Sequence, residues 1–218
     1  MKIINLSEQP SLLQQFLLEI RNRNIQTDSM RFRRNIERIG EVMALEISKT
    51  LNYRNEQIQT PLASIQVPAV TDKIVLGTVL RAGLPFHSGF LNYFDHAENA
   101  FVSAYRSYTD EAHTQIAITC EYKAAPDLNG KTLLLVDPML ATAGSMYAAY
   151  QSLLDNGTPA RIDIACVIAT PVALEYLKQV MPEQTTVWCA AIDPVLNEQK
   201  YIVPGLGDAG DLCYGDKL

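Results

Sequence analysis

The sequence lacks the residue patterns that mark several large classes of protein. Its 218 residues include four cysteines, and no two of them form a Cys-x-x-Cys metal or redox motif. No HExxH motif, Walker A loop, Ser-His-Asp triad or Cys-His pair is evident. No run approaches the roughly 18 apolar residues that a membrane helix needs. We therefore expect no disulfide scaffold, zinc site or membrane span, and we predict that the cysteines are free and mostly buried: Cys120, Cys166, Cys189 and Cys213.

Positive charge is also scarce. Lysine and arginine total 18 against 24 aspartates and glutamates, so the formal net charge is -6. This balance argues against non-specific binding to nucleic acid, which needs net positive surface. It does not exclude an anionic substrate, because a few local donors and backbone N–H groups suffice to bind a phosphate. The N-terminus has no long apolar segment, so no signal peptide is predicted and a cytoplasmic location is expected.

Residues 1–60 are predicted to form a helical arm. Apolar residues recur there at intervals of three or four, which is the spacing of one face of an amphipathic helix. Thr27 or Asp28 is the candidate N-cap. The arginines beside this face are expected to be solvated, with contact to an anionic effector or a partner subunit as the alternative. The apolar positions are Phe32, Ile36, Ile39, Met43, Ile47 and Leu51.

From residue 73 to residue 191, short β-rich apolar runs alternate with helical stretches. This alternation predicts an α/β fold with a mostly parallel sheet flanked by helices. We predict one domain over residues 1–218, with the arm at 1–60, the core at 73–191 and a small hood at 192–218. The strands expected are 74–80, 100–105, 116–122, 132–136, 162–169 and 185–191, with helices at 84–96, after 145 and after Thr170.

A loop of small and hydroxyl residues follows the predicted strand 132–136. Asp137 ends that strand, and residues 138–145 lead into a helix. Helix-N-terminal N–H groups together with Thr142 and Ser145 suit a phosphate, and Asp137 is placed to accept hydrogen bonds from sugar hydroxyls. The plainer interpretation is a helix start with Thr142 or Ser145 as its N-cap.

Two arginines follow strands and are candidates for binding an anion. Arg81 lies in a turn with Gly83 after strand 74–80, and Arg106 ends strand 100–105. Arginine suits concentrated negative charge because it is always protonated and binds oxyanions in a bidentate way. The alternative for Arg81 is an ordinary surface turn. The polar residues 107–114 have no clear period, and neither Tyr105 nor His113 is given a role.

The C-terminal segment 201–211 reads Tyr-Ile-Val-Pro-Gly-Leu-Gly-Asp-Ala-Gly-Asp. With the Leu-Arg-Ala-Gly-Leu-Pro turn and the loop after Asp137, it resembles uracil phosphoribosyltransferases. That resemblance implies the phosphoribosyltransferase fold and transfer of ribose 5-phosphate from phosphoribosyl pyrophosphate (PRPP) to uracil, giving UMP and pyrophosphate.

The resemblance also implies roles for single residues. Catalysis would rest on Arg81, Arg106 and Asp208, and residues 107–114 would close over the site. PRPP, with the Mg²⁺ that it and water carry, would meet Arg81, Arg106, Asp137, Pro138, Met139, Leu140, Ala141, Thr142, Ala143, Gly144, Ser145 and Asp208. Uracil would meet Ile202, Gly207, Asp208 and Ala209.

One position departs from the family pattern, because Ala143 stands where glycine is usual. Two rival interpretations stay open: a regulatory relative that binds RNA, which the net charge disfavours, and a non-catalytic relative, which Ala143 alone favours. The resemblance implies a homo-oligomer, either dimer or tetramer, and leaves open whether GTP is an effector.

Overall fold

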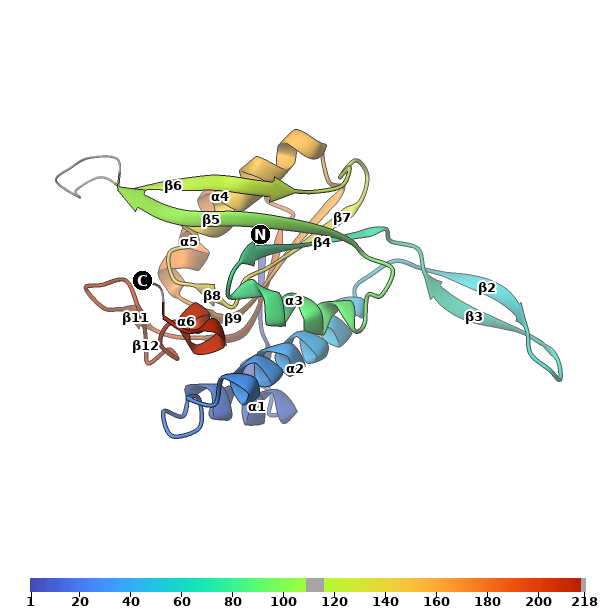
Figure 1. Ribbon diagram of the computed structural model, residues 1–218. Helices are drawn as coiled ribbons and strands as arrows, with labels where there is room; N and C mark the ends of the chain where they lie inside the picture. The colour runs from blue at the N-terminus through green and yellow to red at the C-terminus, as the bar shows by residue number, and fades with distance from the viewer. Residues whose placement is uncertain (109–115, 217–218) are drawn as a thin grey trace.

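The computed structural model describes residues 1–108 and 116–216, and at residues 105–108 and 116–120 it describes the backbone alone. A central sheet runs in the order β1-β10-β9-β7-β4-β5-β6, and β8 pairs with β9 (Figure 1). Every pairing in it is parallel except that of β5 with β6. The strands are β1 Lys2–Asn5, β4 Ile74–Leu80, β5 Glu98–Tyr108, β6 Ile116–Ala124, β7 Thr132–Val136, β8 Met139–Leu140, β9 Arg161–Ala169 and β10 Thr186–Ile192. The predicted α/β fold with a mostly parallel sheet is confirmed.

Helices cover both faces of this sheet, which explains why its strands are continuously apolar. In β7, Leu134 and Val136 pack against one cluster and Leu133 and Leu135 against the other. The first cluster contains α1 Leu12–Arg21, α2 Ser29–Ser48 and α3 Gly83–Leu91, and the second contains α4 Gly144–Leu153 and α5 Pro171–Val180. No described helix is long and apolar enough to cross a membrane.

The prediction of a helical arm over residues 1–60 is right in its middle and wrong at both ends. Helix α2 begins at the predicted cap, where the Asp28 side chain accepts a hydrogen bond from the Arg31 N–H at 3.0 Å, and its predicted apolar face is buried. The first residues instead form β1, which pairs in parallel with β10. Residues 53–59 form β2 Tyr53–Gln59, the first strand of an antiparallel hairpin with β3 Ser64–Val70.

That hairpin extends away from the rest of the molecule (Figure 1). Every residue of β2 is exposed, and most of β3 is exposed too. Its apolar side chains Ile58, Leu62 and Ile65 are all more than two-fifths exposed. The hairpin is therefore held together by the pairing of β2 with β3 and not by burial against the core.

Helices α2 and α3 cross closely at two glycines. A Cβ atom added to Gly89 would lie 2.0 Å from the Glu37 carbonyl oxygen, and one added to Gly40 would lie 2.6 Å from the Phe86 carbonyl oxygen. Both obstacles are backbone atoms, which cannot swing aside as a flexible side chain can. The crossing holds α3, and with it the Arg81 turn that precedes α3, against the N-terminal helices.

We expect Gly89→Ala to destabilise the protein by about 1–3 kcal/mol, because the added methyl group must push the two helices apart. Thermal or chemical unfolding of the purified variant measures this loss. Ser88→Ala on the same helix is the matched control, since Ser88 is exposed and bonds only to the Leu84 carbonyl of its own helix. Equal stability of the Gly89 and Ser88 variants would contradict the close crossing.

Candidate active site

The carboxyl ends of β4 and β7 and the C-terminal segment surround one cavity of about 1080 Å³. Such a position is the usual ligand site of an open parallel sheet. The cavity gathers residues from sequence segments that lie more than 100 positions apart. It is lined by Val79, Leu80, Arg81, Ala82, Ser103, Ala104, Asp137, Met139, Ala141, Ser145, Gln199, Lys200, Tyr201, Ile202, Gly207, Asp208, Ala209, Gly210 and Asp216.

The loop after β7 is held to β9 by backbone hydrogen bonds. The Pro138 carbonyl accepts hydrogen bonds from the Val167 and Ile168 N–H groups at 3.1 and 2.9 Å, and the Leu140 carbonyl accepts one from the Thr170 N–H at 3.1 Å. The Thr170 hydroxyl also donates to the Ala141 carbonyl at 2.7 Å. These bonds use the loop's carbonyl groups for anchoring and fix where Met139 and Ala141 meet the cavity.

Asp137 stands where this loop leaves β7. Its Oδ1 accepts a hydrogen bond from the Met139 N–H at 3.2 Å. Burial raises the pKa of Asp137 to about 7, and the hydrogen bond from Met139 opposes that rise only in part. The residue as a whole is half-buried and lines the cavity. It is therefore poised to become ionised when a ligand offers it further donors.

Ala143 lies at the start of α4 with φ of 58° and ψ of 7°, in the left-handed region. This region costs a residue with a Cβ about 1–2 kcal/mol. The Ala143 side chain is buried in the cluster beneath α4 and does not line the cavity. The methyl group therefore strains the loop backbone without narrowing the cavity.

Arg81 follows β4 and reaches across to the C-terminal segment. Its guanidinium forms an ion pair with Asp211 at 3.0 Å, where the two side chains are 39% and 30% exposed. The Arg81 Nε is buried and has no hydrogen-bond partner among the described residues. This contact joins the turn after β4 to the helix α6 Ala209–Tyr214.

The C-terminal segment forms a small hood from the hairpin of β11 Val195–Leu196 with β12 Ile202–Val203, followed by α6. Asp208 caps α6, and its Oδ1 accepts hydrogen bonds from the Gly210 and Asp211 N–H groups at 2.8 and 3.0 Å. Gly207 has φ of 94°, so its backbone adopts a conformation that favours glycine. Ile202, Gly207 and Ala209 line the cavity beside Asp208.

The cavity brings together most of the residues that the sequence nominates. Members of the nominated set that line it are Arg81, Asp137, Met139, Ala141, Ser145, Ile202, Gly207, Asp208 and Ala209. Members that do not line it are Pro138, Leu140, Thr142, Ala143 and Gly144. The Arg106 backbone lies in β5 opposite Ile118, its side chain is not described, and most of the predicted closing loop with His113 lies outside the described residues.

Sequence reasoning did not nominate several polar residues at the site, among them Ser103, Gln199, Lys200, Tyr201 and Asp216 in the lining and Asp211 beside it. Lys200 lines the cavity from the hood hairpin with φ of 65°, a conformation that no sequence pattern signalled. Asp211 belongs to the motif 201–211, but nothing in the motif shows that it pairs with Arg81. The three cysteines whose side chains are described, Cys166, Cys189 and Cys213, are buried and free as predicted.

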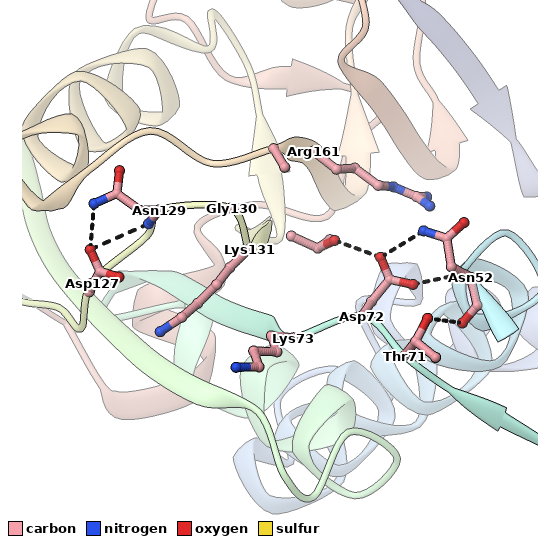
Figure 2. A pocket seen from close by; sticks show the side chains of 11 residues that line it. Asn52, Thr71, Asp72, Lys73, Asp127, Asn129, Gly130, Lys131 and Arg161 are labelled. Carbon is pink, nitrogen blue, oxygen red and sulfur yellow. Dashed lines mark hydrogen bonds between the residues drawn. The ribbon is translucent and has the colours of Figure 1, made fainter. Parts of the chain in front are cut away.

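A second cavity, of about 620 Å³, lies at the opposite edge of the sheet, near the first residues of β4, β7 and β9 (Figure 2). Two of its charged groups already have protein partners: Asp72 accepts hydrogen bonds from Asn52 and Thr132, and Arg161 pairs with the buried Asp163 outside the cavity. These contacts connect the starts of neighbouring strands, and they favour the first cavity as the functional site. Its lining is Asn52, Thr71, Asp72, Lys73, Asp127, Asn129, Gly130, Lys131, Thr132, Ala160 and Arg161.

Comparison with known proteins identifies the family. The family model described as uracil phosphoribosyltransferase matches residues 7–216. A uracil phosphoribosyltransferase of Porphyromonas gingivalis is 56% identical over 218 residues, which is 100% of both chains. The chain belongs to the uracil phosphoribosyltransferase family.

Solved structures show the same fold. A protein from Aquifex aeolicus superposes with a TM-score of 0.86 and 26% identity, covering 98% of each chain. A hypoxanthine-guanine phosphoribosyltransferase from Bacillus anthracis shares the fold alone, with a TM-score of 0.50, 13% identity and coverage of 74% of this chain and 81% of its own. The fold is thus that of a phosphoribosyltransferase, and the protein is an enzyme of the glycosyltransferase type.

The raised pKa of Asp137 predicts a pH-dependent stability in this family member. The folded protein keeps a proton on Asp137 up to about pH 7, whereas the unfolded chain releases it near the ordinary value of 3.8. The contribution of this group to stability is therefore highest at low pH, and it is lost as the pH rises from about 4 to about 7. Asp137→Asn removes the titration and keeps an oxygen that can accept the Met139 hydrogen bond.

We expect the unfolding free energy of Asp137→Asn, relative to the parent, to rise across that window and to level off above about pH 8. One pKa unit corresponds to about 1.4 kcal/mol, and partial exposure of the residue lowers the expected total to about 2 kcal/mol. Urea unfolding at pH 4, 5, 6, 7 and 8 measures the difference. A difference that is independent of pH would show that Asp137 titrates normally.

Proposed function

We propose that this protein transfers ribose 5-phosphate from PRPP to uracil, forming UMP and pyrophosphate. The observation that carries the proposal is that the turn with Arg81, the loop after Asp137 and the segment 201–211 line a single cavity at the carboxyl edge of the sheet. These are the segments that resemble the family, and the chain belongs to that family over nearly its whole length.

The loop after β7 would bind the ribose 5-phosphate end of PRPP. Residues 141–145 lead into the ten-residue helix α4, whose first N–H groups are free of helical partners and attract an anion. Ser145 lines the cavity at that helix start and adds a hydroxyl donor. Asp137 would accept hydrogen bonds from the ribose hydroxyls, which favour the ionised carboxylate and lower its raised pKa. Pro138 and Leu140 would hold the loop to β9 without touching the ligand.

Arg81 and Arg106 would bind the pyrophosphate. In the proposed reaction a ring nitrogen of uracil bonds to the anomeric carbon with inversion. The bond from that carbon to the pyrophosphate oxygen breaks, its electron pair leaves with the pyrophosphate, and the proton of the nitrogen passes to the departing pyrophosphate or to water. Negative charge builds on the departing pyrophosphate, and fixed cations stabilise charge that develops in the transition state. Arg81 already lies at the cavity, where a bound pyrophosphate would compete with Asp211 for its guanidinium.

Uracil would lie against the hood, contacting Ile202, Gly207 and Ala209 mainly through their backbone groups. The ring offers two carbonyl acceptors and N–H donors, and glycine lets a backbone approach a flat ring closely. Cytosine would set an amino group against a backbone donor. A site that leaves a buried polar group unpaired rejects such a near-isostere strongly.

Mg²⁺ would enter with PRPP, where it neutralises pyrophosphate charge. Asp208 and Asp137 both line the cavity, and their carboxylate oxygens would meet this Mg²⁺ through its bound water. The Gly210 and Asp211 N–H groups both donate to Oδ1 of Asp208, and neither uses Oδ2. No cluster of three or more His, Cys, Asp or Glu side chains in the described parts suits a metal ion, so the proposal assigns Mg²⁺ no protein cage.

We also propose that the protein is a homo-oligomer. Large apolar side chains stand exposed on α1 and on the β2–β3 hairpin, including Leu12 at 72% and Leu62 at 96%. Such exposure is costly in water and is common where subunits meet.

A panel of bases tests the proposed reaction. The purified protein with PRPP and Mg²⁺ is expected to form UMP from uracil and to use cytosine, hypoxanthine and adenine at least about 10³-fold less well, because the hood's polar groups match uracil alone. Product formation is followed by chromatography, with each base measured at several concentrations. Comparable turnover of a purine base would overturn the assignment, and a chain inactive with every base would favour the non-catalytic relative.

The variant Ala143→Gly tests whether alanine in the phosphate loop only strains the backbone or also abolishes activity. Glycine relieves about 1–2 kcal/mol of left-handed strain and gives back about 0.4–1 kcal/mol through a more flexible unfolded chain. We therefore expect a net stabilisation of about 0.5–1 kcal/mol and less than a tenfold change in PRPP affinity and turnover. Urea unfolding and steady-state kinetics measure the two effects. An inactive parent that gains strong activity in the variant would show instead that alanine has disabled the loop.

A further inference from the structure

We propose that Arg21, Gln26 and Asp193 are positioning residues that fix the base-recognition loop, residues 202–209, in the register needed to discriminate uracil from cytosine. The inference rests on the proposed function, because it assigns a role in recognising that base. None of the three residues lines the cavity. Any effect they have on the base must therefore pass through the loop.

Arg21 and Asp193 form a forked ion pair behind the loop. The Arg21 Nη1 and Nη2 groups donate to the Asp193 Oδ2 and Oδ1 atoms at 2.7 and 2.9 Å. Arg21 ends α1 and Asp193 follows β10, where its side chain is only 7% exposed. A bidentate pair of this kind fixes direction as well as distance, because the guanidinium and the carboxylate must be nearly coplanar.

Both partners of this pair also form hydrogen bonds with the backbone of Gly205. The Gly205 N–H donates to Asp193 Oδ2 at 2.8 Å, and its carbonyl accepts a hydrogen bond from Arg21 Nη1 at 3.1 Å. Gly205 has φ of 58°, and an added Cβ would lie 2.1 Å from the Ile202 carbonyl oxygen. The turn from Ile202 to Gly205 is therefore tight, so a shift of the ion pair that moves Gly205 would also move Ile202.

Gln26 holds the next residue of the loop. Its Nε2 group donates to the Leu206 carbonyl at 2.9 Å and to the Ile20 carbonyl at 2.8 Å. Leu206 is 4% exposed. The end of α1 and the connection to α2 thus hydrogen-bond two consecutive residues of the loop, Gly205 and Leu206, immediately before Gly207 enters the cavity.

This arrangement makes base recognition depend on the arm. Hydrogen-bond discrimination needs backbone groups held within a fraction of an ångström, and a misplacement of about 1 Å that originates far from the chemistry can cost on the order of 10²-fold in rate. The loop that binds PRPP is anchored instead to β9 and Thr170. Removing the hydrogen bonds from the arm to Gly205 and Leu206 should therefore change base binding and leave PRPP binding nearly unchanged.

The test uses Gln26→Met, which removes both hydrogen bonds at similar side-chain size, with Arg21→Lys and Arg21→Met as a graded pair. Steady-state constants are measured for uracil, PRPP and cytosine. We expect Gln26→Met to raise the KM for uracil about tenfold, to change the KM for PRPP less than twofold, and to raise the cytosine-to-uracil ratio of kcat/KM at least about fivefold. Arg21→Lys should retain more uracil affinity than Arg21→Met.

Arg31→Ala is the matched control, because it breaks the Arg31–Glu19 ion pair of 3.0 Å on the same arm without touching the hood. It should behave as the parent. Hydrogen exchange without substrate gives a second readout, with faster exchange expected in a peptide covering residues 202–208 of Gln26→Met than in Arg31→Ala. This readout holds even if the parent fails to use uracil, an outcome that would overturn the proposed function.

Three results would overturn the positioning role itself. These are unchanged uracil constants and selectivity in a folded Gln26→Met, equal rises of the KM values for uracil and PRPP, and unchanged exchange over residues 202–208. A fall in thermal stability with kinetics like those of the parent would assign the three residues a structural role only.

Discussion

The site depends on the pairing of the loop after β7 with β9. Carbonyl groups of Pro138 and Leu140 accept hydrogen bonds from the end of β9 and from Thr170, so the loop continues the sheet for two residues as β8 before it turns into α4. The anchored loop thereby places Met139 and Ala141 at the cavity. Without this anchor Asp137 and Ser145 would belong to a flexible connection, and the start of α4 would have no fixed relation to Arg81 across the sheet.

Strands and helices that are buried and regular could be predicted from the sequence. The predicted bounds of strands 74–80 and 132–136 match the structure. Short runs of β-branched and apolar residues indicate strands that are buried on both faces, because they are too short for a typical helix. Asp28 and Thr170 were recognisable as caps, since their side chains sit before apolar periodicity. The site followed from the same logic, because its motifs come directly after strands whose carboxyl ends meet.

The features that could not be predicted from the sequence depend on contacts between distant residues or lie in exposed backbone. Strand β1 has only four residues and exists because Lys2 lies opposite Thr186 in β10. The β2–β3 hairpin buries almost nothing: β2 has no alternation of apolar and polar residues, and the alternation in β3 covers only its first few residues. The left-handed conformation of Ala143 contradicts the local preference of alanine, and only the anchored loop imposes it. Arg21 and Asp193 stand 172 positions apart, beyond the reach of any motif.

The two halves of the cavity are supported in different ways, and this difference has a functional consequence. The side proposed to bind PRPP is built on parallel strands and their backbone bonds, which side-chain substitutions leave largely intact. The side proposed to bind the base is a short hairpin and a six-residue helix, held by Arg21, Gln26 and Asp193 behind it and by Asp211 on Arg81 in front. Because the Arg81–Asp211 pair spans both halves, an anion that draws Arg81 away also releases the front of the hood. If Arg81 binds pyrophosphate as proposed, this binding and the position of the loop 202–209 would be linked through one side chain, while the rear contacts would keep the loop in place when the front contact opens.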